Sequence, residues 1–248
     1  MFWENIGTFF HIISTDLGYM APYFVSGTTL STLLVCAAFL AIILIAYFLG
    51  SINFAIIISG KKYKEDIRNH GSKNAGMTNM MRTYGKKAAV FTLVGDALKA
   101  VIACFIGYVI MGQLGAYAAG LFCMVGHVFP IYYGFKGGKG VVTAAATVLM
   151  TDWLVFLVLL ALFILMVAIW RYISLASITC MILYPLILSF TTKIFLGRMS
   201  PFIIFTVLMA ALIIGKHWGN IQRLRDGTES KFSFKKSVKA PAENVDGE

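Results

Sequence analysis

The sequence predicts an all-α integral membrane protein with seven transmembrane helices. Hydrophobic residues make up 59% of its 248 residues. Charged residues make up only 13%, whereas a soluble domain has roughly 25%. The apolar runs are also much longer than the roughly ten residues of a membrane-barrel strand. A bundle of membrane-spanning helices is therefore the expected fold.

Seven apolar runs follow one another along the chain. Most are close to the roughly 20 residues that a helix needs to cross a bilayer, and the run at 141–150 is short for a span. We expect the spans at 31–58, 88–111, 114–133, 141–150, 153–169, 173–190 and 201–215.

The basic residues support this count and predict the orientation. With the N-terminus outside and seven crossings, the cytoplasmic side receives eight Lys or Arg from the loop at 59–87, seven from the tail beginning at Lys216, and Lys136, Lys139 and Arg171. These are eighteen of the twenty-one, as the positive-inside rule requires. A re-entrant segment at 141–150 would turn Arg171 and the basic tail outward.

Composition also suggests three regions. Residues 1–30 form an N-terminal extracytoplasmic extension, in which apolar residues near helical spacing suggest an interfacial helix. Residues 31–229 form the membrane domain. Residues 230–248 form a basic, polar cytoplasmic tail that we expect to be disordered. The net charge of +10 favours contact with anionic membrane lipids over nucleic acid.

The four cysteines lie in apolar runs and form no C-x-x-C pair, so we interpret them as small buried hydrophobic residues. They suggest neither disulfides nor a metal site.

A glycine-rich stretch interrupts the apolar pattern at 126–140, where the sequence is G-H-V-F-P-I-Y-Y-G-F-K-G-G-K-G. Gly137, Gly138 and Gly140 surround Lys139. Glycines allow backbone N–H groups to turn toward one point, and a lysine adds positive charge there. This stretch predicts a phosphate site, although it lacks the spacing of a Walker loop.

The stretch G-S-K-N-A-G-M-T-N-M-M-R at 71–82 is the second candidate. Arg82 is a bidentate donor suited to phosphate, and Ser72, Asn74, Gly76 and Asn79 could complete the shell. The alternative is a helix start capped in this stretch. Both interpretations can hold, since a helix start itself binds anions.

The third candidate is the stretch at 217–229, with His217, Asn220 and Glu229 on a short amphipathic helix. Arg171 and Ser174 lie at a span boundary on the same predicted side. A juxtamembrane basic helix and a snorkelling arginine are the alternatives. Under the predicted topology all these groups converge at the cytoplasmic face.

Asp96 and Lys99 are ionisable residues inside a predicted span, three residues apart on one helix face. We favour a mutually neutralising structural pair slightly over a direct catalytic role. His127 is equally compatible with a general base and with a helix-end histidine bonded to a backbone carbonyl.

Taken together, these motifs resemble the bacterial acyl-phosphate:glycerol-3-phosphate acyltransferase family. The resemblance rests on the stretches at 71–82 and 126–141, on G-D-A-L-K at 95–99, R-Y-I-S-L-A-S at 171–177 and N-I-Q-R-L-R-D-G-T-E at 220–229. It implies a seven-helix enzyme of the bacterial cell membrane with its active site on the cytoplasmic side. By motif matching it implies a catalytic set of Ser72, Arg82, Lys139, Ser174, Asn220 and Glu229.

The reaction implied is transfer of a fatty acyl group from acyl phosphate to the 1-hydroxyl of sn-glycerol 3-phosphate. The product is lysophosphatidic acid, in the first acylation step of phospholipid synthesis. Acyl phosphate is already activated, so the chemistry needs no cofactor and no metal in principle. The enzyme that makes acyl phosphate is a further candidate partner.

Two other classes compete with this interpretation. An anion transporter would explain Asp96 and Lys99, but the chain lacks the internal repeat of many transporters. A lipid phosphotransferase of the CDP-alcohol type needs clustered metal-binding aspartates, whereas the aspartates here are widely scattered.

Overall fold

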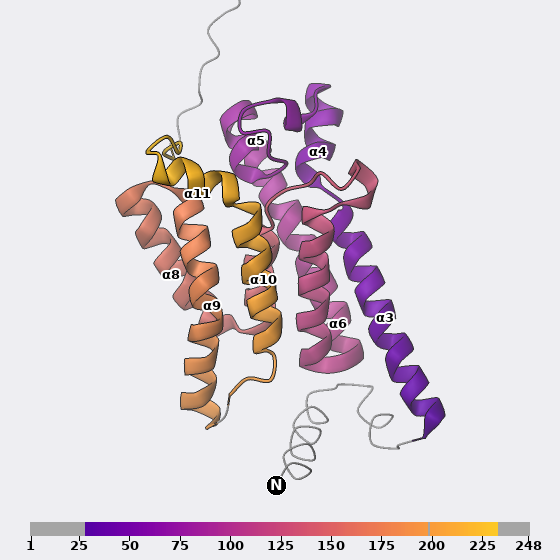
Figure 1. Ribbon diagram of the computed structural model, residues 1–248. Helices are drawn as coiled ribbons and strands as arrows, with labels where there is room; N and C mark the ends of the chain where they lie inside the picture. Colours follow the sequence, from indigo (N-terminus) through magenta and orange to yellow (C-terminus); the bar gives the residue numbers. More distant parts are fainter. Residues whose placement is uncertain (1–27, 198, 233–248) are drawn as a thin grey trace, which may run out of the picture.

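The computed structural model describes residues 28–197 and 199–232, and this part of the chain is helical without a β-strand (Figure 1). The interfacial helix expected within residues 1–30 lies outside the described residues, as does the tail from residue 233 onward. The helices are α3 (Thr29–Ser51), α4 (Phe54–Ile58), α5 (Met77–Tyr84), α6 (Lys86–Val128), α7 (Val141–Thr151), α8 (Trp153–Trp170), α9 (Ile173–Leu196), α10 (Ile203–Lys216) and α11 (Trp218–Arg225).

The first predicted span, 31–58, is interrupted near its polar end. α3 ends at Ser51, and Asn53 adopts an extended backbone conformation before α4 begins. The Asn53 side chain accepts a hydrogen bond from the Ile56 amide at 3.1 Å, which caps α4. Its Nδ2 donates to the Ala75 carbonyl at 3.2 Å. One asparagine thus ends the long helix and attaches it to the loop before α5.

The second and third predicted spans form the two arms of α6. Met111 and Gly112 have non-helical dihedral angles, and Gly112 has a φ of 56°. The arms meet backbone to backbone, because a Cβ on Gly107 would overlap the carbonyl oxygen of Gly115. A tight helical hairpin therefore separates these spans, as the sequence predicts.

Shorter helical turns complete the fold: the π-helical turn η2 (Ser59–Tyr63) and the 3-10 turns η3 (Ile67–Asn69) and η4 (Ile131–Tyr133). Figure 1 shows α4, α5 and α11 together at one end of the bundle, where the polar loops also lie. The long helices run from this end toward the other. The polar stretches are thereby gathered at one end of the bundle.

Four helices in the described residues are long and apolar enough to cross a membrane, and a fifth if α10 and α11, bent by 59°, are one span. One of the four is the segment Lys86–Tyr133, which contains the α6 hairpin. The long helices of the bundle expose large hydrophobic side chains such as Phe91 and Phe105 on α6, Leu157 on α8 and Phe190 on α9. An apolar outer surface on a helical bundle is typical of a protein that faces lipid.

The apolar end of the bundle also contains a buried polar cluster. The Asp152 carboxylate, in the turn between α7 and α8, accepts hydrogen bonds from the Tyr117 and Tyr184 hydroxyls. Gln113 donates to the Thr151 carbonyl at 2.6 Å. These bonds satisfy the polar groups of a helix break inside an apolar core, where unsatisfied groups are costly.

Candidate active site

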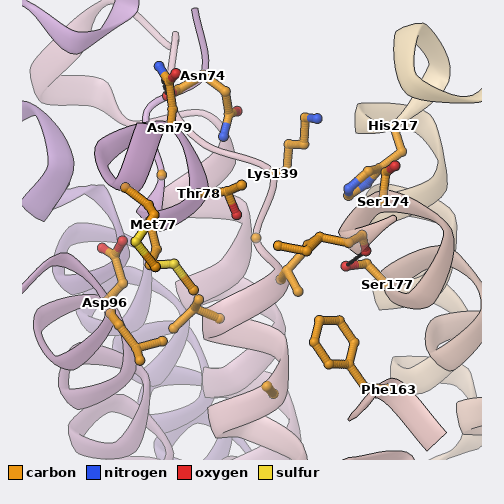
Figure 2. Close-up of a pocket in the computed structure, with 18 of the residues that line it drawn as sticks. Asn74, Met77, Thr78, Asn79, Asp96, Lys139, Phe163, Ser174, Ser177 and His217 are labelled. Carbon is orange, nitrogen blue, oxygen red and sulfur yellow. Dashed lines mark hydrogen bonds between the residues drawn. The ribbon is translucent and has the colours of Figure 1, made fainter. Parts of the chain in front are cut away.

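A cavity of about 1600 Å³ opens at the polar end of the bundle. Figure 2 shows Asn74 and Thr78 on one side and Ser174 and His217 on the other, with Lys139 between them. Farther down, the walls are apolar side chains of α6, α7, α8 and α9, including Phe163. A space with one charged end and one apolar end suits an amphiphile with an anionic head and a hydrocarbon tail.

Lys139 is positioned by the closely packed loop between α6 and α7. A Cβ on Gly138 would overlap the His127 imidazole and approach the Ala75 carbonyl oxygen to 2.6 Å, so only glycine fits. Lys139 Nζ donates a hydrogen bond to Asn220 Oδ1. Burial lowers the pKa of Lys139 to about 8, opposed by the Glu229 carboxylate and reinforced by nearby cations. The ammonium is therefore charged at neutral pH but loses its proton easily.

Only one of the three glycines around Lys139 is placed as expected for phosphate binding. The Gly137 amide donates to the Val128 carbonyl at 3.2 Å, and the Gly138 amide donates to the His127 carbonyl at 3.1 Å. Neither residue lines the cavity. The expectation that these two amides point at a phosphate is therefore not met, because they fasten the loop to the end of α6. Gly140, with a φ of +83°, does line the cavity and directly precedes α7.

Three helices begin at the cavity without a side-chain cap. α5 starts after Gly76, α7 after Gly140 and α9 after Tyr172. The first residues of all three helices line the cavity. An uncapped helix start presents unpaired amide N–H groups and the positive end of the helix dipole. Three such starts around one space form an anion-binding surface.

Glu229 joins three side chains on the opposite wall. Its Oε1 accepts from Ser174 Oγ at 2.7 Å and from Asn220 Nδ2 at 2.6 Å. Its Oε2 accepts from Arg223 Nε at 2.7 Å. Burial alone would raise the pKa of Glu229, but these hydrogen bonds outweigh it and lower the pKa below its ordinary value. The ionised carboxylate thus orients Asn220, which in turn receives the Lys139 hydrogen bond.

The stretch at 71–82 supplies the facing wall. Asn79 is buried, and its amide group donates to the carbonyls of Ile67, His70 and Asn74. Its Oδ1 accepts from the Ser72 amide at 2.9 Å. Asn79 therefore holds the loop in shape, while Ser72 and Asn74 line the cavity. Arg82 lies farther along α5 at the same cavity and donates to the Ser230 carbonyl at 3.5 Å.

His217 lies at the junction of α10 and α11 and lines the cavity. Its Nδ1 is 2.8 Å from the Ile213 carbonyl oxygen. Because a carbonyl only accepts, Nδ1 carries the proton of the neutral ring and Nε2 is left as an acceptor. A neutral His217 with this tautomer can accept a hydrogen bond from a substrate.

Asp96, Lys99 and His127 form a second polar cluster, which is almost completely buried. Lys99 Nζ donates to the carbonyls of Gly50 at 2.8 Å and Ile52 at 2.6 Å, and lies 3.0 Å from Asp96 Oδ1. It is also 2.9 Å from His127 Nδ1. Asp96 and His127 contact the cavity wall, but they are only 1% and 4% exposed. This geometry favours the structural interpretation, in which Lys99 ties the end of α3 to α6.

The predicted site residues thus mostly share one cavity. Its lining includes Ser72, Asn74, Gly76, Asn79, Arg82, Asp96, His127, Lys139, Gly140, Ser174, His217, Asn220 and Glu229. Lys99 and Arg171 do not line it. Arg171 ends α8 in a left-handed conformation and is exposed, and its carbonyl accepts from the Phe232 amide at 2.6 Å.

The structure adds lining residues that the sequence interpretation did not select. His70 directly precedes the stretch at 71–82, and Ser177 ends the stretch at 171–177. Proximity to the motifs was the only available signal for both. Ser230, Lys231 and Phe232 also line the cavity, so the site extends three residues beyond Glu229. Among the described residues, no cluster of three or more His, Cys, Asp or Glu side chains could hold a metal ion.

The comparisons with known proteins agree on one family. The family profile described as glycerol-3-phosphate acyltransferase matches residues 40–227. The glycerol-3-phosphate acyltransferase of Trichlorobacter lovleyi is 47% identical over 190 residues, covering 75% of this chain and 94% of the relative. That of Coxiella burnetii is 40% identical over 198 residues, covering 79% of this chain and all of the relative.

Solved structures support the same assignment. The crystal structure of PlsY, an integral membrane glycerol 3-phosphate acyltransferase, in its glycerol 3-phosphate form has a TM-score of 0.71 and 37% identity, covering 79% of this chain and 96% of that one. Its lysophosphatidic acid form has a TM-score of 0.69 and 36% identity, with the same coverage. With this shared sequence and fold, the chain belongs to the glycerol-3-phosphate acyltransferase family of integral membrane proteins.

Proposed function

We propose that the protein transfers a fatty acyl group from acyl phosphate to the 1-hydroxyl of sn-glycerol 3-phosphate. The observation that carries the proposal is a single cavity that joins a cation-rich end to an apolar groove. Both substrates carry a phosphate, and one also carries a hydrocarbon chain. The charged end offers Lys139, Arg82 and three helix starts for two phosphates, and the groove offers space for the acyl chain.

In the reaction, the glycerol 1-hydroxyl oxygen attacks the acyl carbonyl carbon. The new C–O ester bond forms as the bond between that carbon and the phosphate oxygen breaks, so that phosphate leaves. The hydroxyl proton passes to a phosphate oxygen of the donor. Holding both substrates in this geometry supplies much of the rate enhancement, and the positive end stabilises the developing negative charge.

The site residues divide into direct and positioning roles. We propose that Ser72, Arg82, Lys139 and Ser174 contact the substrates, with Asn74, the Gly76 and Gly140 helix starts and His217 beside them. Asn220 and Glu229 hold Lys139 and Ser174 in place through the hydrogen bonds described above. Asn79 keeps Ser72 in position.

We further propose seven membrane crossings, with the N-terminus outside and the site on the cytoplasmic side of the bacterial cell membrane. The two arms of α6 and the helices α3, α7, α8, α9 and α10 supply the seven crossings. The polar ends of these helices lie at the level of the basic loops, which supports a cytoplasmic site. Soluble glycerol 3-phosphate, and the enzyme that produces acyl phosphate, would approach from that side.

The activity is tested with purified protein, labelled glycerol 3-phosphate and palmitoyl phosphate in detergent micelles. We expect labelled lysophosphatidic acid and one phosphate released per product. Palmitoyl-CoA in place of palmitoyl phosphate should give no product. Product formed from palmitoyl-CoA but not from palmitoyl phosphate would contradict the proposal that acyl phosphate is the donor. Uptake of glycerol 3-phosphate into vesicles without acyl product would contradict the whole proposal and favour a transporter.

The topology is tested by labelling single cysteines with a membrane-impermeant maleimide, in a Cys36→Ser background because Cys36 is exposed. Lys136→Cys should react only from the cytoplasmic side. Lys193→Cys, near the end of α9, should react only from the other side. Labelling of both from one side would rule out the proposed crossings.

A further inference from the structure

Side chains of four helices line the lower part of the cavity. On each helix, the lining residue nearest the apolar end is Val101 on α6, Leu149 on α7, Phe156 on α8 and Met181 on α9. The first arm of α6, α7 and α9 run away from the polar end, whereas α8 runs back toward it. The last lining residue of α6, α7 and α9 and the first lining residue of α8 are therefore the lowest on their helices, and we call these four side chains the groove floor.

A fixed turn lies directly beneath the groove floor. α7 has only 11 residues and ends at Thr151, and the chain turns at Asp152 into α8. Asp152 in this turn accepts hydrogen bonds from Tyr117 and Tyr184, the latter at 3.2 Å. Tyr184 lies three residues after Met181, about one helical turn below it. These bonds keep the turn, and hence Leu149 and Phe156 on either side of it, from shifting.

The groove has a definite length and an open side. From Gly140 to Leu149 α7 advances by nine residues, or about 14 Å at 1.5 Å per residue. Leu93 and Val94 on the α6 wall are 37% and 48% exposed, so the groove is open toward the surrounding lipid along that side. A chain can therefore enter sideways, but its end meets the floor.

We propose that the groove floor sets the longest acyl chain that the enzyme accepts efficiently. The inference rests on the proposed function, because it takes the apolar end of the cavity to hold the acyl chain of the donor. Leu149 is its most informative position. It is the last lining residue of α7, and it is 44% exposed, so its size can change without opening a void in the packed core.

The experiment compares kcat/KM for dodecanoyl, tetradecanoyl, hexadecanoyl and octadecanoyl phosphate, with glycerol 3-phosphate saturating. In Leu149→Trp the raised floor should lower the ratio of hexadecanoyl to dodecanoyl transfer by about fourfold for each methylene that no longer fits, the value of burying one methylene. In Leu149→Ala the ratio of octadecanoyl to hexadecanoyl transfer should rise instead. Opposite shifts from one position exclude a general loss of activity as the cause.

Leu157→Trp is the matched control, since Leu157 is 50% exposed on the neighbouring helix α8 and does not line the cavity. Its chain-length profile should equal that of the wild type. If Leu149→Trp fails to fold, Phe156→Ala, which lowers the floor from α8, takes its place. Unchanged ratios in all floor variants would overturn this inference alone. A wild type that transfers no acyl group from any acyl phosphate would overturn the proposed function itself.

Discussion

Lys99 and Lys139 belong to two polar clusters of similar composition but opposite surroundings. Lys99 is only 4% exposed and is surrounded by the Gly50 and Ile52 carbonyls, Asp96 and His127. Lys139 donates to one side chain, Asn220, and lines an open cavity. Each cluster combines a lysine with a carboxylate and one further polar side chain, which is His127 beside Lys99 and Asn220 beside Lys139. The difference shows that access to a substrate, rather than residue type, separates a structural cluster from a candidate catalytic one.

Removing the Lys99 charge should give the largest effect, and it should fall on stability. Lys99→Met leaves Asp96 buried without its cation, which costs about 3–5 kcal/mol for a broken buried pair. We expect a lower thermal unfolding temperature in detergent, measured by intrinsic fluorescence. The second substitution Asp96→Asn should recover part of the loss, because no uncompensated charge then remains.

Lys193→Met is the control for this experiment, since Lys193 is exposed at the end of α9. It should change stability by less than about 0.5 kcal/mol. A normal unfolding temperature for Lys99→Met together with lost turnover would contradict the structural assignment and would move this cluster into the active site.

Removing the Lys139 charge should act on catalysis instead. Lys139→Ala deletes a cation that faces the phosphates, and we expect kcat/KM to fall by about 10²- to 10³-fold. The unfolding temperature should stay near that of the wild type. Lys136→Ala is the matched control, three residues earlier in the same loop and exposed, and it should remain active. Equal losses in the two variants would mean that only the net charge of the loop matters.

Glu229→Gln tests whether the carboxylate positions its neighbours. The substitution keeps the side-chain shape, but its amide nitrogen cannot accept a hydrogen bond as the carboxylate oxygen does. At least one of the hydrogen bonds from Ser174, Asn220 and Arg223 is then lost, and the arrangement around Lys139 loosens. We expect a loss of about 10- to 100-fold in kcat/KM, the value of hydrogen bonds to a charged group. Asp226→Asn, where the carboxylate pairs with Arg225 at 3.0 Å on the exposed side of α11, is the control. Glu229→Asp keeps the charge but retracts the carboxylate by one methylene, so a loss in kcat/KM as large as that of Glu229→Gln would support positioning over simple charge.

The sequence predicts much of this arrangement because its signals are local. Apolar runs and basic loops predict the helices, and the hairpin in α6 forms where the second and third predicted spans meet. The predicted polar stretches do share one cavity. The sequence could not show that Asn53 interrupts the first span, since one asparagine in an apolar run carries no such signal.

The direction of individual groups is equally invisible in the sequence. The Gly137 and Gly138 amides bond to the end of α6, and Arg171 does not line the cavity. Both depend on loop geometry that three-dimensional packing alone decides. The choice between structural and catalytic roles for Asp96 and Lys99 likewise needed the positions of the Gly50 and Ile52 carbonyls, which are distant in sequence.

The smallest expected effect is a pH dependence of kcat/KM that follows the charge of Lys139. Burial lowers the pKa of Lys139 to about 8, so its charge is present below pH 8 and is lost as the pH rises through 8. A substrate phosphate with a second pKa of about 6 is already dianionic at pH 7. We therefore expect kcat/KM to fall about tenfold between pH 7 and pH 9, in proportion to the charged fraction of Lys139.

Lys139→Arg keeps the charge throughout this range, because an arginine does not lose its proton in proteins. Whatever its absolute activity, its kcat/KM should stay nearly constant from pH 7 to pH 9. A histidine cannot produce the wild-type decline, since its ordinary pKa of about 6.5 places its titration below this window. If kcat/KM of Lys139→Arg declines as steeply as that of the wild type, a group other than Lys139 causes the decline. The comparison between buried Lys99 and cavity-lining Lys139 would then rest only on the Lys99→Met and Lys139→Ala variants.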